Sequence, residues 1–373
     1  MSTPPTLNLP QSARLNPMDR TLDLGDIEAV RLLLRGNSVI DWNRVHFHDY
    51  AEVNQFLRLH LIEPGDPDDE ARLRLVHSEA VNYLEQHLGL HFPDALAHPA
   101  DVRDVFLTAS QTGGFRRQQI QACVILKLMH VINHMEAAEL RFYTPLSEAE
   151  LMTMAEARVV EAISQLRREG FPMVDFYGSR KERHSVITKL LVKREATAAT
   201  VFDKLRFRII TEEPEHIWAC LAWMHRNLVP VNAVIPGQSH NNLLRLDRWL
   251  RSANNAAYAS QLQGWSLEED DFNPEENPFS GASYRMVNFI VHIPVRVDGS
   301  VDHKHISLLG KRVFVLIEFQ LMDAQTAIAN EQGENAHELY KERQRAIVGA
   351  RLRKGARWKR RAQHKTGKVE PVD

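Results

Sequence analysis

The chain has 373 residues, a formal net charge of −2, 44% hydrophobic residues and 25% charged residues. This composition excludes global disorder and allows a sizeable core, while the length predicts two domains or one domain with large additions. The near-neutral charge also excludes a protein that is basic over its whole length, as many nucleic-acid-binding proteins are.

Nothing in the sequence indicates a membrane or an export route. No apolar run approaches the length of a membrane span, and the polar, proline-containing N-terminus shows no signal-peptide pattern. The two cysteines, Cys123 and Cys220, lie in apolar stretches of helical character, which is typical of reduced, buried thiols in the cytosol. We therefore expect a cytoplasmic protein without a membrane partner.

Residues 1–170 are predicted to form a mostly helical N-terminal region that opens with a loose leader. Apolar residues at helical spacing predict four helices in it. They span 26–35, 71–88, 118–141 and 147–170. The last one begins with a capping box in which Ser147 and Glu150 satisfy each other's backbone N–H groups.

Two histidine patterns in this region each have a metal interpretation and a plainer one. His46, His48 and Asp49 match part of a metal-dependent His-Asp hydrolase pattern, but we favour an ordinary polar helix start because short motif matches are weak evidence. His130 and His134 stand at i and i+4, a spacing that can chelate a metal. Because the glutamate of the zincin motif is absent there, we favour a solvated or core-satisfied pair.

The character of the chain changes after Gly170. Residues 171–177 are predicted to form a short strand, and a basic segment follows in which Lys181, Ser185 and Lys189 recur at i, i+4 and i+8. Such a row on one helix face suits a polyphosphate, because each ammonium group neutralises one oxygen. The alternative interpretation is a solvated basic face.

The next segments predict a mixed sheet. A strand should end the segment 201–210, with Asp203 at its entry and Arg208 within it, and a helix should follow over 211–228. Residues 230–280 have the composition of an inserted loop with one short helix. Strands at 287–297 and 313–321 are expected to pair as a hairpin. This order predicts an α+β fold around a mixed β-sheet flanked by helices.

The last of these strands carries the most informative polar residues. Its odd-numbered residues from Val313 to Leu321 are apolar and share one face, so Glu318 and Gln320 project together from the other. A carboxylate on so apolar a strand is costly to bury alone. We therefore expect a cation, a metal ion or a hydroxyl donor in front of Glu318. The plainer alternative is a structural salt bridge with Arg208 or Arg312.

Four blocks, in this order, resemble the synthetase domain of the RelA/SpoT-type alarmone synthetases. The resemblance covers residues from about 178 to 342, and its last block is the most specific. The blocks are the basic segment with Lys181, Ser185 and Lys189; Phe202–Ile209 with Asp203 and Arg208; Ser283–Asn288 with Tyr284; and Ile317–Met322 followed by Asn330–Lys341.

The resemblance implies a nucleotidyltransferase-like fold and transfer of pyrophosphate from ATP to the 3′-hydroxyl of a guanine nucleotide with Mg²⁺. It implies that Asp203 and Glu318 are catalytic and hold the metal ion, and that Glu318 accepts the proton of the attacking hydroxyl. Nucleotide binding falls to a second set. That set is Lys181, Arg183, Ser185, Lys189, Arg208, Tyr284 and Gln320, with Tyr284 stacking on the acceptor base.

Two further interpretations stay open. Residues 343–373 form a basic tail, and clusters of Lys and Arg bind phosphate backbones, so the acceptor could be the 3′ end of a tRNA. The family's usual histidine and arginine are replaced by Asn288 and Met322, so a nucleotide-binding module without turnover is the other alternative. Nothing in the sequence indicates the oligomeric state.

Overall fold

The protein is described here from a computed structural model. The described residues are 22, 24–36, 46–111, 116–193, 203–251, 283–332 and 337–352. The expectations for the N-terminal leader, for most of the insertion and for the basic tail beyond residue 352 fall outside these residues.

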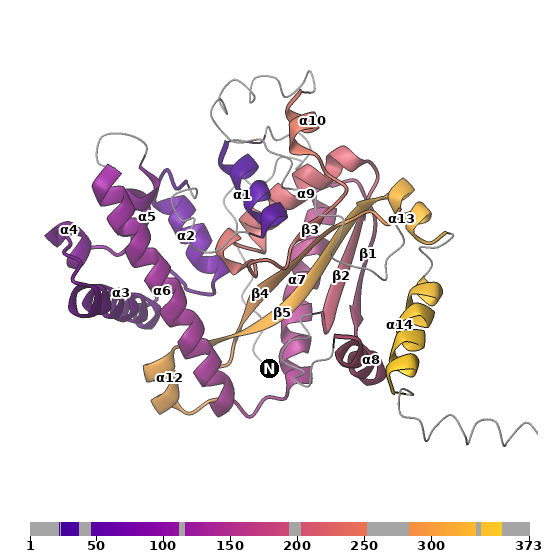
Figure 1. Cartoon of the computed structure of the whole chain (residues 1–373). Helices are drawn as coiled ribbons and strands as arrows, with labels where there is room; N and C mark the ends of the chain where they lie inside the picture. The colour runs from indigo at the N-terminus through magenta and orange to yellow at the C-terminus, as the bar shows by residue number, and fades with distance from the viewer. Residues whose placement is uncertain are drawn as a thin grey trace, which may run out of the picture.

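A five-stranded mixed sheet forms the centre of the molecule, with the strand order β1-β2-β5-β4-β3 (Figure 1). The strands are β1 (Met173–Arg180), β2 (Leu205–Thr211), β3 (His240–Asn241), β4 (Val287–Arg296) and β5 (Arg312–Asp323). Strands β2 and β5 run parallel, and every other neighbouring pair is antiparallel. The predicted α+β arrangement and the β4–β5 hairpin are therefore confirmed.

Aromatic residues from three neighbouring strands fill one face of the sheet. Phe207, Phe319 and Phe289 are fully buried, and their rings stack in sequence with centroid separations of 5.9 and 5.6 Å. Because side chains alternate along a strand, this apolar face leaves the intervening residues of β2 and β5 on the opposite face. The candidate site lies there.

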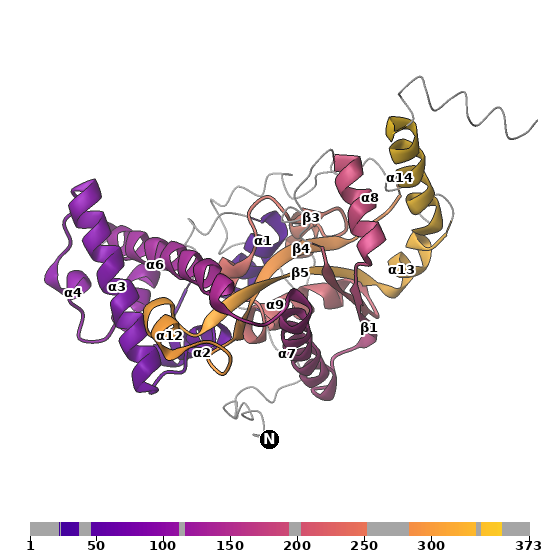
Figure 2. The ribbon, with the colours of Figure 1, turned by 90° about the horizontal axis from the view of Figure 1, so that it is seen from below.

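The first 170 residues are mostly helical, as predicted. Their helices are α1 (Leu24–Arg35), α2 (Tyr50–Leu59), α3 (Pro67–Leu88), α4 (Asp94–Ala97), α5 (Arg103–Ser110), α6 (Arg116–Tyr143) and α7 (Glu148–Arg168). The capping box of α7 is present, with Glu150 accepting from the backbone N–H of Ser147 at 2.7 Å. Figure 2 shows α3 at one end of the molecule, with α6 running from it toward β5.

The remaining helices follow the strands. They are α8 (Arg183–Lys193), α9 (Pro214–Asn227), a short 3₁₀ turn at Val231–Ala233, α10 (Leu246–Arg251), α12 (His303–Leu309), α13 (Ala324–Asn330) and α14 (His337–Leu352). Helices α8 and α14 pack side by side beyond the β1 edge of the sheet. Among the described residues, no helix combines the length and the apolar character that a membrane crossing requires.

The helices contribute to two hydrophobic cores, and this grouping does not follow their order in the chain. The sheet core includes Ile27 of α1, Val159 of α7 and Leu221 of α9, whereas a second core is built from α2, α3, α5 and α6. Helices that precede residue 170 therefore contribute to the sheet core as well as to a core of their own. The division of the chain into domains at that residue stays a prediction.

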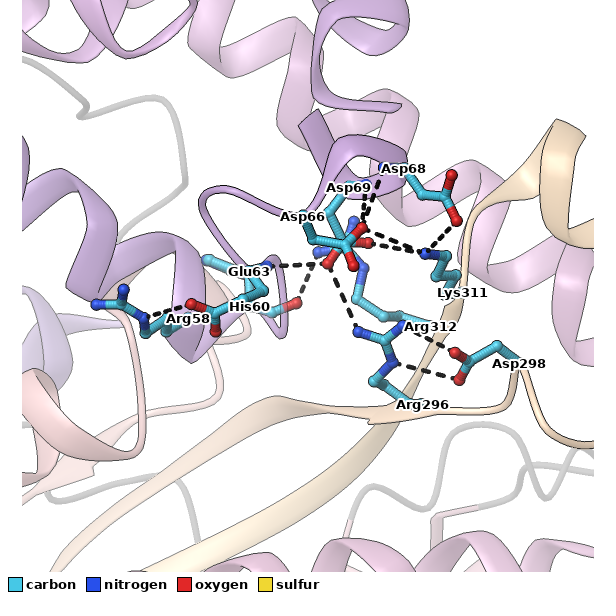
Figure 3. A network of polar contacts seen from close by, with 10 residues as sticks. All are labelled: Arg58, His60, Glu63, Asp66, Asp68, Asp69, Arg296, Asp298, Lys311 and Arg312. Atoms are coloured by element: carbon cyan, nitrogen blue, oxygen red, sulfur yellow. Dashed lines mark hydrogen bonds and ion pairs between the residues drawn. The ribbon is translucent and has the colours of Figure 1, made fainter. Parts of the chain in front are cut away.

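A charged network joins the second core to the far end of the hairpin (Figure 3). Lys311 lies 3.3 Å from Asp68 and 3.4 Å from Asp69 at the start of α3. Arg296 lies 3.5 Å from Asp69 and 2.8 Å from Asp298. Acidic residues at the N-terminus of a helix are stabilised by its free N–H groups. Arg296 and Lys311 therefore connect the hairpin to the acidic N-terminus of α3.

Two expectations about local structure need correction. Residues 230–280 were expected to be a loop with a short helix, and α10 is that helix, but His240 and Asn241 also form an edge strand opposite Asn288 and Val287 of β4. Two residues are too few to give a recognisable alternation. In addition, α8 begins at Arg183, so Lys181 precedes the helix instead of sharing its face with Ser185 and Lys189.

Candidate active site

Strands β2 and β5 present a row of charged and polar side chains on the face opposite the aromatic core. Arg206 lies beside Glu318, and Arg208 lies beside Gln320, in the parallel register of the two strands. The alternation of β2 is strict, since Leu205, Phe207 and Ile209 are fully buried while Arg206 and Arg208 are partly exposed. A parallel pair in register directs neighbouring side chains to the same side, so four functional groups meet here.

Asp203 stands just before β2 and is surrounded by cations. Its carboxylate binds the ammonium group of Lys181, that of Lys189 at 2.6 Å, and the guanidinium of Arg206 at 3.4 Å. Burial would raise the pKa of Asp203, but the ammonium groups of Lys189 and Lys181 outweigh it and hold that pKa well below its ordinary value. Asp203 is therefore ionised at neutral pH although it is 6% exposed.

Glu318 reaches the same guanidinium from β5. The Nε group of Arg206 donates to Glu318 Oε2 at 2.5 Å, and the side-chain amide of Gln320 donates to Glu318 Oε1 at 3.2 Å. Glu318 is only 5% exposed. The two carboxylates that the sequence singled out, which are far apart in the chain, thus share one arginine.

Arg206 is the residue that sequence reasoning missed. The expected salt-bridge partners of Glu318 were Arg208 and Arg312, but Arg312 donates instead to the carbonyl of His60 at 2.6 Å. The alternation Arg206–Phe207–Arg208 could have identified it, because residues two apart on a strand share a face. Only the parallel register shows which of the two arginines is opposite Glu318.

Arg208 lies one step further along the row. It donates to the hydroxyl of Tyr177 at 2.7 Å and to Gln320 Oε1 at 3.2 Å, and its other contact is Glu331 at 3.5 Å. Gln320 therefore connects Arg208 to Glu318. Among the described residues, Arg208 Nε and Asn288 Oδ1 are buried without a hydrogen-bond partner. Asn288 lies opposite Gln320. The Gln320 side chain is therefore flanked, on the same face, by the Nε donor of Arg208 and the Oδ1 acceptor of Asn288, neither of which has a hydrogen-bond partner.

Tyr284 lies between these groups and β3. The side-chain amide of Asn242 donates to its backbone carbonyl at 2.7 Å. Burial raises the pKa of the Tyr284 hydroxyl, while the positive charges of Arg208 and Arg206 partly oppose that shift. The raised pKa keeps the hydroxyl protonated at physiological pH. The role of the ring toward a base stays a prediction.

Two predicted nucleotide-binding residues are not drawn into this cluster. Arg183 is exposed and Ser185 is half-buried, and both lie in the first turn of α8. Within the described part of the chain, no hydrogen bond or ion pair joins either side chain to Asp203 or Glu318. Their roles toward a nucleotide stay predictions.

The histidine patterns of the N-terminal region follow their plainer interpretations. Asp49 is the N-cap of α2 and accepts from the backbone of Glu52 at 3.0 Å, while the exposed His48 contacts the Glu52 carboxylate. His130 and His134 pack ring against ring at 4.3 Å. Among the described residues, no group of three or more His, Cys, Asp or Glu side chains has an arrangement that could hold a metal ion.

The carboxylate pair nevertheless has suitable donors for Mg²⁺. Magnesium prefers carboxylate oxygens and commonly takes only one or two from the protein, with the remaining ligands supplied by water and substrate phosphates. Asp203 and Glu318 are two such donors, and one guanidinium already spans them. The donor set fits a magnesium–nucleotide complex better than a metal held by the protein alone.

Comparisons with known proteins give distant structural matches. No protein-family model matches the sequence, and no curated protein matches it. A Bacillus subtilis small alarmone synthetase 1 bound to its product pppGpp aligns at 12% identity and a TM-score of 0.30, over 54% of this chain and 89% of that one. A GTP pyrophosphokinase family protein from Streptococcus pneumoniae aligns at 12% identity and a TM-score of 0.29, over 60% and 95% of the two chains.

Proposed function

We propose that the chain is a nucleotide pyrophosphokinase that transfers pyrophosphate from ATP to the 3′-hydroxyl of a guanine nucleotide. The observation that carries the proposal is the meeting of Asp203 and Glu318 at one guanidinium, next to two lysines. Pyrophosphoryl transfer depends mainly on positioning and charge neutralisation, and this cluster offers both. The sequence resemblance supplies the reaction, and the geometry supports it.

The charge of the cluster suits a polyphosphate. Three cations, Lys181, Lys189 and Arg206, contact the two buried carboxylates, which leaves an excess of one positive charge. Arg208, with its partner Glu331, lies one step further along the row. All four of these cationic side chains are less than a third exposed, so solvent screens them weakly. An anion with several oxygens would neutralise the excess and form charge-assisted hydrogen bonds.

Each residue then has a role in the proposed reaction. Asp203 and Glu318 hold Mg²⁺, which neutralises phosphate charge when bound. Lys181, Lys189 and Arg208 neutralise the phosphates of ATP, and Tyr284 stacks on the acceptor base. Gln320 orients Glu318 through their 3.2 Å hydrogen bond.

The transfer step balances as follows. The acceptor 3′-oxygen forms a bond to the β-phosphorus of ATP, the bond from that phosphorus to the bridging α-oxygen breaks, and AMP leaves. The proton of the 3′-hydroxyl passes to the carboxylate of Glu318. The hydrogen bond from Arg206 positions the Glu318 side chain in the cluster, and a positioned carboxylate can act as a general base.

A transfer assay with matched variants tests the proposal. Purified protein, Mg²⁺ and ATP labelled in its γ-phosphate are combined with GDP, GTP, ATP or bulk tRNA as the acceptor. Label should appear in a guanine nucleotide, and Glu318→Gln should lower that rate by on the order of 10²–10³-fold. The control is Asp323→Asn, the same change at another buried carboxylate of β5 that caps α13.

The acceptor series also decides between the open alternatives. Label in tRNA would show that the acceptor is an RNA 3′ end and not a guanine nucleotide. ATP binding without Glu318-dependent transfer to any acceptor would leave a nucleotide-binding module without turnover. Equal losses in Glu318→Gln and Asp323→Asn would mean that Glu318 acts through stability alone, and would contradict its catalytic role.

A further inference from the structure

Arg206 has an unusual position for a residue in a metal site. Its Nε and Nη2 atoms contact Glu318 at 2.5 Å and Asp203 at 3.4 Å, so one cation spans both carboxylates that would bind Mg²⁺. The two carboxylates are almost fully buried, and the arginine side chain is 27% exposed. A divalent ion bridging the same two carboxylates and Arg206 in this position would compete for the same oxygens.

The neighbouring cations do not share this position. Lys181 and Lys189 contact Asp203 and have no described contact with Glu318, while Arg208 contacts Gln320 and Tyr177. Burial would lower the pKa of Arg206, but the carboxylates of Glu318 and Asp203 raise it above its ordinary value. The guanidinium is therefore the single described group that neutralises both acids at once.

We propose that Arg206 is an internal counter-ion for Asp203 and Glu318 that Mg²⁺ must displace, and that the displaced guanidinium then binds the phosphates of the nucleotide. This inference rests on the proposed function, because it takes the two carboxylates as the metal ligands. In the absence of nucleotide, Arg206 keeps the metal affinity low. With nucleotide bound, the phosphates offer the arginine a second set of oxygens, so metal and nucleotide bind cooperatively.

The reason for the cooperativity is electrostatic. Displacing Arg206 without an anion at hand would leave a buried guanidinium unpaired, which is costly. A phosphate removes that cost because guanidinium and phosphate form bidentate, charge-assisted hydrogen bonds. Coupling between two ligands is reciprocal, so the metal should raise nucleotide affinity by the same factor by which the nucleotide raises metal affinity.

Manganese binding provides a readout that does not depend on turnover. Free Mn²⁺ is measured by electron paramagnetic resonance with the full-length wild type, Arg206→Gln and Arg206→Lys, all without nucleotide. Arg206→Gln should bind Mn²⁺ on the order of tenfold more tightly, which corresponds to the loss of one competing ion pair. Arg206→Lys should lie between the two, since an ammonium group is a point charge that pairs less well with two carboxylates at once.

Arg208→Gln is the matched control. It removes a guanidinium from the same strand and the same face, two residues away, but Arg208 contacts neither Asp203 nor Glu318. Its Mn²⁺ affinity should stay within about twofold to threefold of the wild type, as expected for a screened neighbouring charge. Circular dichroism and thermal unfolding establish that each variant is folded.

Nucleotide coupling completes the test. Binding of a non-hydrolysable ATP analogue is measured with and without Mn²⁺, and the ratio of the two affinities should be smaller in Arg206→Gln than in the wild type. Unchanged or weaker Mn²⁺ binding in Arg206→Gln, or an unchanged ratio, would overturn the proposal. Tighter Mn²⁺ binding and a smaller ratio in Arg206→Gln, without label transfer from ATP, would support the displacement of Arg206 by the metal. That outcome would contradict only the proposed transfer reaction.

Discussion

The same face of the β4–β5 hairpin holds polar side chains in two different ways. At one end, the buried side chain of Glu318 is paired with the guanidinium of Arg206. At the other end, His292 of β4 and His134 of α6 lie against Phe314, with His134 stacked on that ring at 4.3 Å. Residues 314 and 318 are four positions apart on β5, so their side chains project from the same face of the sheet.

The histidine end avoids charge, whereas the carboxylate end keeps it. Burial lowers the pKa of His60 and His292 to about 3 and that of His134 to about 4. Asn232 satisfies the ring nitrogens of His60 and His130, each at 3.0 Å. These neutral rings fill an interface between α6 and the sheet, while Glu318, four residues along β5 from Phe314, lies in an ion pair with Arg206.

The largest stability effect is expected from removing Asp203. Asp203→Ala leaves Lys181 and Lys189 without their shared carboxylate, and breaking a buried ion pair costs about 3–5 kcal/mol. The free energy of unfolding, measured with urea, should fall by that amount. A loss below about 1 kcal/mol, the value typical of exposed pairs, would show that solvent already screens the cluster. The carboxylate end would then not differ from an ordinary surface ion pair.

Acid should affect the histidine end first. Because the folded-state pKa values of these histidines lie below the unfolded value of about 6.5, the unfolded state binds more protons as the pH falls below 6.5. Stability is therefore full above pH 6.5 and is lost progressively toward pH 4, by up to about 1.4 kcal/mol per pH unit for each histidine. Asp203, whose pKa is lowered, contributes its loss only at more acidic pH.

Chemical unfolding at pH 7, 6 and 5 measures this dependence. His134→Phe keeps a ring against Phe314 and removes one titrating group, so its stability should fall less steeply with pH than that of the wild type. An exposed pair provides the control: His48→Phe removes a histidine that lies against Glu52 at the surface. If both variants changed the slope equally, burial at the α6 interface would not be the cause.

A smaller effect is expected within the carboxylate end. Gln320→Leu removes the hydrogen bond that orients Glu318 and leaves the carboxylate and its arginine in place. Losing a group that orients a functional side chain typically costs about tenfold to a hundredfold. In the transfer assay kcat should fall while the KM for ATP changes little. A raised KM with unchanged kcat would assign Gln320 to ground-state nucleotide binding instead.

Sequence reasoning reached the framework of the sheet and two of the acids within it. Strict alternation in β5, a local signal, identified Glu318. The resemblance to the alarmone synthetases identified Asp203 at the entry to β2. The α+β fold followed from the order of such local signals, and the structure confirms it.

The missing features depend on contacts between distant segments. The pairing of Arg206 with Glu318 needs the parallel register of strands that are separated by more than a hundred residues. The neutral state of His134 needs Phe314 and His292 from the hairpin. The edge strand His240–Asn241 is too short to show periodicity. None of these three features can be predicted from a pattern within one segment of the chain.

The most direct test is a crystal structure with Mn²⁺ and a non-hydrolysable ATP analogue, in which anomalous scattering locates the metal. We predict one ion coordinated by carboxylate oxygens of both Asp203 and Glu318, with the guanidinium of Arg206 moved to a phosphate. A metal bound elsewhere, with Arg206 still between the two carboxylates and the nucleotide away from Lys181 and Lys189, would contradict this prediction.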